Sequence, residues 1–228
     1  MKKKFWAGWA LVALLTLSGC ATRTPMAYSE DATAKVEPQK AVYLLTAKLK
    51  NDYRPTFQPK MIVLHVEKAG GKEVADRLNF VIDDKGRLET GTADGNTYLM
   101  RLQLEPGEYV LRGVTSMTLS FPIMGTFFTP MHSTLTVGPP GLYYLGRVSA
   151  AVRERKDDEF RAGPPIPLID QAVAGASGGT FDIEIVDAWA DDESRFRQRF
   201  PVIAAHPVQK AILPAFDRPT AQKWWQDH

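Results

Sequence analysis

The sequence predicts a mainly β protein, an antiparallel β-sandwich of about eight strands with a C-terminal α-helical extension. The first observation is a period-two alternation of apolar and polar side chains, in short runs between residues 40 and 187. The second is the Pro, Gly, Asn and Asp residues that separate these runs and favour turns. The third is a change to a helical period after Asp187.

Each predicted strand is an apolar, β-rich run that ends at a turn signal. The strands are expected at residues 41–49, 61–66, 78–82, 97–104, 108–117, 132–137, 142–152 and 180–186. The segment 97–104 alternates most clearly. Glu105, Pro106 and Gly107 follow it, and they suit a turn because proline fits the second position and glycine accepts positive φ.

The C-terminal extension, residues 188–228, predicts helices in short pieces. Trp189, Phe196 and Phe200 lie at i, i+7 and i+11, so they fall on one face of a helix. Asp191 is expected to cap the start of this helix, because a carboxylate there accepts hydrogen bonds from free backbone N–H groups.

The first 19 residues have the pattern of a secretory signal. Three lysines at positions 2–4 precede an apolar run, residues 5–17. That run is too short for the roughly 20 residues that a bilayer-spanning helix needs. The next residues, Leu17-Ser18-Gly19-Cys20, resemble the lipobox of bacterial lipoproteins. In that family the signal is cleaved before the cysteine, whose thiol carries a diacyl lipid and whose new amino group is acylated, for example with palmitate.

This resemblance implies that Cys20 becomes a lipid-anchored first residue and holds the protein on a membrane. Because Ala21 rather than aspartate follows, it implies the outer membrane, with the domain facing the periplasm. Residues 20–39 are polar or small and include Pro25 and Pro38, so we expect a flexible tether. Roughly 20 such residues have a root-mean-square reach of about 25 Å.

The charge balance does not indicate nucleic-acid binding. The whole chain has 28 Lys and Arg against 26 Asp and Glu, and three of those lysines lie in the signal. The processed chain would therefore be close to neutral, without the excess of basic residues typical of nucleic-acid-binding proteins. Cys20 is the only cysteine, so no disulfide can form within the chain.

Two turn-and-strand motifs carry a second resemblance. Residues 104–111 read LEPGEYVL, and residues 137–146 read VGPPGLYYLG. Together they resemble bacterial lipoproteins with a DUF2846-like, carboxypeptidase-regulatory-like β-sandwich, which repeat a Pro-Gly-x-Tyr entry and a glycine turn before Tyr-Tyr-x-Gly. The resemblance covers about residues 40–187. It implies the sandwich fold and an envelope location, and it implies no catalytic residue.

The segment 117–131 contains no charged residue and is the leading candidate for partner contact. Two prolines and a glycine interrupt it, so we expect a long loop. Exposed apolar patches mark contacts with membranes or proteins, whereas the alternative is that the segment packs as core beneath the C-terminal extension. The proposed contact residues are Phe121, Ile123, Met124, Phe127 and Phe128.

Trp224 and Trp225 join this candidate surface. They lie in a short helix expected over residues 220–226. Adjacent residues on a helix point about 100° apart, so both cannot face one narrow core stripe. We expect one of them to cover the sandwich and the other to be exposed to a partner.

Residues 175–179 match the G-x-S-x-G motif of α/β-hydrolases, with Ser177 as the serine and His206 later in the chain. That motif requires a helix after the serine, whereas a strand is expected at residues 180–186. A glycine-rich loop is therefore favoured over a nucleophile.

The remaining polar residues predict neither a metal site nor a cofactor. The histidines do not show the short spacings of metal-ligand pairs. Asp182 and Glu184 share one strand face and would suit acid–base chemistry, but they alternate with apolar residues, which favours a solvated face. The histidines are His65, His132, His206 and His228.

The leading expectation is a non-enzymatic, lipid-anchored module that binds a protein or another envelope component. Two alternatives stay open. One is a small-ligand or lipid binder with an apolar cavity between the sheets. The other is a cell-envelope hydrolase that uses Ser177 and His206.

Overall fold

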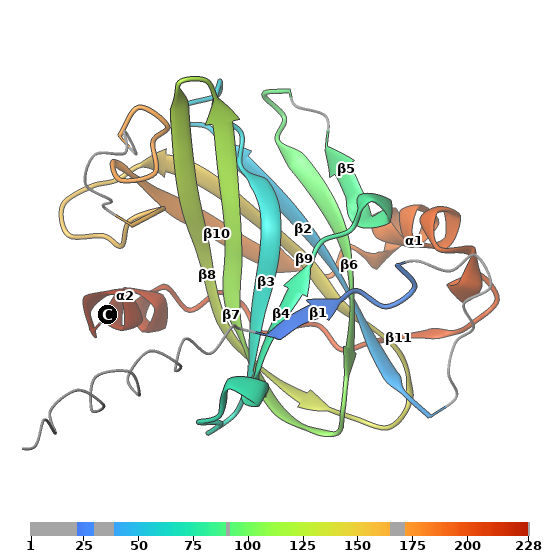
Figure 1. Cartoon of the computed structure of the whole chain (residues 1–228). Helices are drawn as coiled ribbons and strands as arrows, with labels where there is room; N and C mark the ends of the chain where they lie inside the picture. The colour runs from blue at the N-terminus through green and yellow to red at the C-terminus, as the bar shows by residue number, and fades with distance from the viewer. Residues whose placement is uncertain (1–21, 30–38, 90–91, 165–171, 228) are drawn as a thin grey trace, which may run out of the picture.

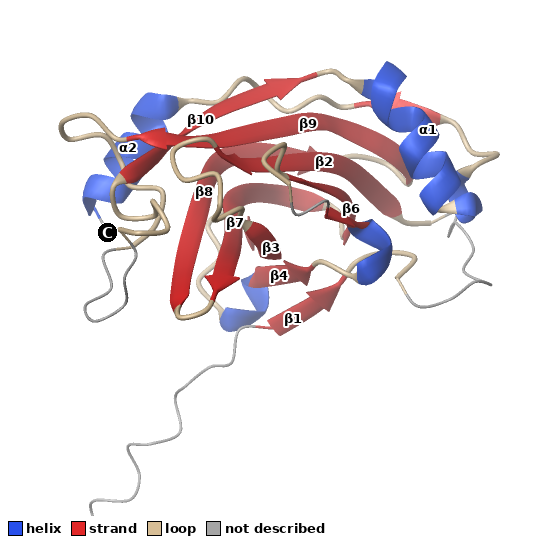
Figure 2. Ribbon diagram, turned by 90° about the horizontal axis from the view of Figure 1, so that it is seen from above, coloured by secondary structure: helices blue, strands red, loops and turns tan. Residues whose placement is uncertain are grey.

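The computed structural model describes residues 22–29, 39–89, 92–164 and 172–227 and confirms a mainly β fold (Figure 1). Two β-sheets form the layers of a sandwich, and two α-helices lie outside it (Figure 2). No helix in the described part of the chain is long and apolar enough to cross a membrane. The expected signal and Cys20 lie outside the described residues.

The five-stranded sheet has the order β1-β4-β3-β7-β8. Strand β1 pairs in parallel with β4, and the other neighbours are antiparallel. A short 3₁₀ turn, η1 (Val74–Asp76), joins β3 to β4. The strands are β1 (Thr22–Pro25), β3 (Lys60–Lys68), β4 (Arg77–Val81), β7 (Gly107–Ser120) and β8 (Ile123–Val137).

The six-stranded sheet has the order β10-β9-β2-β6-β5, and β11 pairs with the first part of β9. A second 3₁₀ turn, η2 (Asp84–Gly86), precedes β5. Strands β2 and β11 both run parallel to β9, so the predicted antiparallel pairing holds for most neighbours but not for these. The strands are β2 (Ala41–Asn51), β5 (Arg87–Glu89), β6 (Asn96–Leu104), β9 (Gly141–Glu154), β10 (Gly179–Val186) and β11 (Val208–Lys210).

All the predicted strands are present, because their alternation matches the pleat of the sheets. The structure differs from the predicted flexible tether, residues 20–39, at residues 22–29. Strand β1 pairs with β4 there, and Met26 is buried in the core. Ala27 exchanges two hydrogen bonds of 2.9 Å with Arg101, one to its backbone carbonyl and one from its guanidinium Nε. Strand β1 is a four-residue edge strand, and its pairing with β4 uses backbone hydrogen bonds. The polar composition of residues 20–39 gave no sign of this pairing.

The core between the sheets is a continuous cluster of buried side chains. Its largest members include Tyr43, Phe80, Phe127 and Phe181, which come from both sheets. The loop at Ala162 joins the sheet edges on one side. The Ala162 carbonyl accepts from the Phe128 N–H at 2.8 Å, and the Ala162 N–H donates to the Gly179 carbonyl at 2.7 Å.

A second apolar layer lies on the outer face of the six-stranded sheet. Helix α1 (Trp189–Arg199) and the 3₁₀ turn η3 (Pro201–Ile203) cover part of this face (Figure 2). Phe196 and Phe200 are buried there, and Trp189 packs against them, which confirms the predicted helical face. The predicted cap was wrong, because the N-cap is Ala188.

Asp192 on α1 is a fully buried carboxylate. It accepts hydrogen bonds from the Tyr144 hydroxyl at 2.6 Å and from Arg147 Nε at 3.2 Å, and it also pairs with another Arg147 nitrogen. Burial and the bond to Asp192 raise the pKa of Tyr144. The same carboxylate raises the pKa of Arg147. Because a buried charge is costly unless it is paired, this contact fixes α1 onto β9.

The C-terminal helix, α2 (Arg218–Asp227), closes the side of the sandwich between β8 and β10. Arg218 bonds Asp182 at 2.9 Å, and Arg153 bonds both Asp182 and Glu159. Arg153 and the Lys156 backbone lower the pKa of Glu159 to about 2. These ion pairs hold the start of α2 against β9 and β10.

We predict that Asp192→Ala destabilises the fold by about 3 kcal/mol, because it leaves Arg147 and the Tyr144 hydroxyl without their partner. Asp191→Ala is the matched control. Asp191 is the preceding residue on α1, its side chain is 74% exposed, and it approaches Arg147 only to 3.7 Å. Urea unfolding measures both variants, and equal midpoints for the two would contradict this role of Asp192.

We predict that Glu159→Gln reduces the loss of stability in acid. The pKa of Glu159 falls from 4.5 to about 2 on folding, so its charge stabilises the fold above pH 4.5. That contribution is lost as the pH falls from 4.5 towards 2. Unfolding midpoints at pH 5.5 and near pH 2 should therefore differ less in the variant than in the wild type. An equal difference would show that Glu159 gains nothing from Arg153.

Candidate functional site: an exposed hairpin tip and a charged trough

The segment 117–131 is a β-hairpin, and the prediction of a long loop was wrong. Strand β7 continues to Ser120 and β8 begins at Ile123, so only a two-residue turn separates them. Pro122 lies in that turn, where no ladder N–H is required. Pro130 lies opposite Gly113, beside a shift of register in the ladder. Prolines are tolerated at such irregularities, which explains why they do not break the hairpin.

The end of this hairpin is apolar and exposed. The side chain of Phe121 is 94% exposed and that of Leu119 is 72% exposed, while Met124 is exposed to a lesser degree. Ile123 is half-buried and packs towards the core. We call Leu119, Phe121, Ile123 and Met124 the hairpin tip. Leu119 was not singled out from the sequence, although its register partner in the hairpin is Met124.

The base of the hairpin does not belong to this surface. Phe127 is buried and packs edge-on against Phe181, with ring centroids 6.5 Å apart. Phe128 is half-buried beneath α2, 5.6 Å from the Trp224 ring. The five predicted contact residues of this segment therefore fall into two groups. Phe127 and Phe128 pack inside the structure, whereas Phe121 and Met124 are exposed to solvent.

Trp224 and Trp225 are both half-buried, and neither lies in the hairpin tip. Trp224 covers β8, where its ring lies 5.0 Å from that of His132. Trp225 packs against the core cluster, and the Arg155 guanidinium lies 5.9 Å from its ring centre. The expectation that one tryptophan is exposed to a partner was wrong, because α2 packs both rings against the sandwich.

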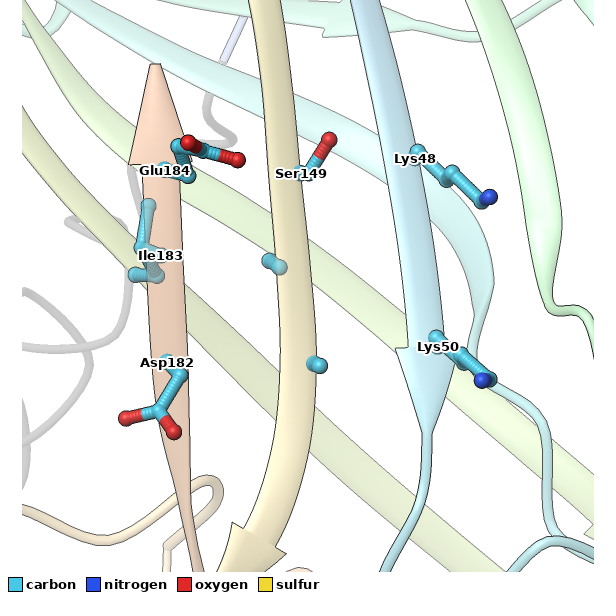
Figure 3. Close-up of a pocket in the computed structure, with 8 residues that line it drawn as sticks. Lys48, Lys50, Ser149, Asp182, Ile183 and Glu184 are labelled. Carbon is cyan, nitrogen blue, oxygen red and sulfur yellow. The ribbon is translucent and has the colours of Figure 1, made fainter.

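A charged trough lies on the outer face of β10, β9 and β2, beyond the part that α1 covers (Figure 3). It is a hollow of about 350 Å³. Glu184, Ser149 and Lys48 are paired across the three strands in one row. In Figure 3 the Glu184 carboxylate points towards β9, and the Lys48 ammonium group leans away from it. The small Ser149 side chain forms the floor.

Two of the four charged side chains that line the trough are paired. Asp182 bonds Arg153 and Arg218, and Lys50 pairs with Asp52 at 2.8 Å, which raises the pKa of Lys50. Ile183 packs towards the core while Asp182 is exposed, so the prediction of a solvated charged face is confirmed. The trough is an open sheet surface, and the described residues show no hydrogen bond between the Ser149 hydroxyl and the Glu184 carboxylate.

A second hollow, of about 560 Å³, lies between the end of β1 and the β4–η2 turn. Met26 and Asp83 line it, and Arg101 holds Asp83 in place through a two-pronged ion pair.

The structure does not bring Ser177 and His206 together. Ser177 precedes β10, whereas His206 follows α1, and the eight residues of β10 span about 26 Å. The Ser177 carbonyl accepts from Arg161 at 2.7 Å, and the His206 carbonyl accepts from Arg197 at 3.2 Å. Figure 1 shows the segment before β10 and α1 at opposite sides of the molecule.

His65 is hydrogen-bonded within the five-stranded sheet. The two ring nitrogens of His65 lie 2.7 Å from the Asn79 side-chain oxygen and 2.8 Å from the Thr115 hydroxyl. Within the described ranges, no group of three or more His, Cys, Asp or Glu side chains is arranged to hold a metal ion.

Comparisons with protein-family models, curated proteins and solved structures found no match to this chain. The candidate site is therefore interpreted from its own geometry. The feature of the described surface that is hardest to explain by folding alone is the hairpin tip, because it exposes large apolar side chains to solvent.

Proposed function

We propose that this protein is a lipid-anchored, non-enzymatic module of the bacterial cell envelope that binds another protein through the hairpin tip. The observation that carries the proposal is the exposure of Phe121, which is 94% exposed at the end of an uncharged hairpin. Burying an aromatic side chain of this size contributes about 1.5–3 kcal/mol, so a partner with an apolar pocket gains affinity there.

The lipobox resemblance supports the anchoring part of the proposal. Cys20 would carry the acyl chains, and one buried chain binds a membrane only weakly whereas two or more bind stably. Ala21 favours an outer-membrane location with the domain in the periplasm. The resemblance to DUF2846-like lipoproteins agrees with this location and belongs to the same proposal. Neither the ligand-binding nor the hydrolytic alternative has a comparable observation in its favour.

We predict that Phe121→Asp abolishes capture of the partner without unfolding the protein. The expected change in the free energy of unfolding is within about 0.5 kcal/mol, because the side chain is exposed. The measurement is affinity capture of the full chain from crosslinked cells, which should show a discrete crosslinked protein for the wild type and none for the variant.

Val186→Asp is the matched control, because it adds the same charge at an exposed apolar residue outside the tip. It should retain the partner. Retention by Phe121→Asp, or equal loss in both variants, would rule out the hairpin tip as the binding surface. Phe127→Asp is unsuitable as a probe because Phe127 is buried and a charge there would unfold the core.

We predict that the intact protein isolated from membranes begins at Cys20 and carries acyl chains, as its measured mass will show. Cys20→Ser should abolish this added mass and release the protein from the membrane fraction. A protein that stays membrane-bound without acyl mass would show that something other than the lipid holds it there.

A further inference from the structure

Strand β1 determines where a lipid anchor would leave the folded domain. It runs parallel to β4, and Thr22 pairs with Leu78. Residues that precede Thr22 therefore leave the sheet in the same direction as the residues that precede Leu78, which are Arg77 and η1. One residue separates Cys20 from Thr22, and two residues of chain span at most about 7 Å. An anchor on Cys20 would thus lie next to η1.

We infer that the η1 end of the five-stranded sheet lies directly against the membrane, with the segment 68–77 in contact with phospholipid headgroups. The inference rests on the proposed lipidation of Cys20 and adds the orientation of the domain to it. We call this segment the membrane-facing loop. The expected tether of about 25 Å is absent between Cys20 and the fold, because residues 22–29 are part of the fold.

The chemistry of the membrane-facing loop suits a headgroup region. The side chain of Val74 is 42% exposed at its apex, and Lys72 and Arg77 are exposed on either side of it. The Asp76 carboxylate accepts hydrogen bonds from the backbone N–H groups of Lys72 and Glu73, at 3.1 Å each. Glu73 completes the reciprocal capping box with Asp76.

The Asp76 carboxylate is therefore bound to the loop's own backbone, whereas Glu73 and the three cations of the loop are exposed. Lys68, Lys72 and Arg77 form no ion pair with the described residues. Positive side chains around an apolar residue complement anionic phosphates above an acyl region. Glu108 lies beside the loop, because its backbone carbonyl accepts from the Ala69 N–H at 2.8 Å. Its carboxylate accepts from the Thr136 hydroxyl on β8 at 2.9 Å.

The same geometry directs the hairpin tip away from the membrane. The row that contains Thr22 and Leu78 continues through Val66 to Leu111 on β7. Phe121 is ten residues further along this hairpin, a distance of about 33 Å. Figure 1 shows the tip of the β7–β8 hairpin and η1 at opposite ends of the sheet. A tip so placed meets a partner in the aqueous space and not the bilayer that holds Cys20.

Single introduced cysteines test this orientation, because lipidation consumes the thiol of Cys20 and no other cysteine is present. Val74→Cys and Phe121→Cys are each labelled with a polarity-sensitive fluorophore in the acylated, full-length protein. The protein is bound to vesicles of phosphatidylethanolamine and phosphatidylglycerol. Quenching by spin-labelled lipid should be at least about threefold stronger for the label at Val74 than for the label at Phe121, whose position about 33 Å from the anchored row keeps it in water.

The possible results distinguish a wrong orientation of the domain from a failure of the proposed lipid anchor. If the mass shows acylation and the protein is on vesicles, equal quenching at the two positions, or stronger quenching at Phe121, overturns the orientation alone. If the protein carries no acyl chain, both the anchor and the orientation fail. Ser120→Cys, beside the tip, is a second solvent-exposed label and should behave like Phe121→Cys.

Discussion

The structure depends on the burial of both faces of β2. Its first seven residues, 41–47, are buried without interruption, a pattern more typical of a strand covered on two sides than of a surface strand. Tyr43 and Leu45 face the core between the sheets, and Val42 and Leu44 face the apolar layer beneath α1. The C-terminal extension is therefore required to cover the sheet. Beyond the part of the sheet that the C-terminal extension covers, Lys48 is exposed to solvent and lines the charged trough.

The buried ion pair of Asp192 and Arg147 follows from this requirement. A helix that covers an apolar sheet face gains free energy from burial but not a unique position, because the hydrophobic effect is not directional. The carboxylate of Asp192 has hydrogen-bond partners on β9 alone, the Tyr144 hydroxyl and the Arg147 guanidinium, so it favours one placement of α1. Removing one partner of such a pair leaves a buried charge uncompensated, which is costly. The ion pairs of α1 and α2 are made with β9 and β10 of the six-stranded sheet. The two ends of the five-stranded sheet, the hairpin tip and η1, take no part in these pairs.

Much of the fold was predictable from the sequence, because alternation and turn residues are local signals. The eight expected strands and the helical face of Phe196 and Phe200 all depend on such signals. Features set by distant residues were not predictable. The burial of Asp192 depends on Arg147 of β9, which is 45 residues away in the chain. Strand β1 depends on its pairing with β4 and on the bonds between Ala27 and Arg101. Pro130 suggested a loop, because the sequence does not reveal that it lies opposite an irregularity of the ladder. That irregularity is set by the partner strand, β7. The exposed tip was found only in part, since the uncharged segment contains both core and surface residues.

We propose a sandwich that separates a membrane-held end from an apolar tip, so that the tip contacts a protein and the opposite end contacts lipid. The most direct measurement is site-specific photocrosslinking in living cells, with a photoreactive amino acid at position 121 and, separately, at position 74. We predict a discrete protein adduct from position 121 and lipid adducts from position 74. Lipid adducts from position 121, or the same protein adduct from both positions, would contradict this proposal.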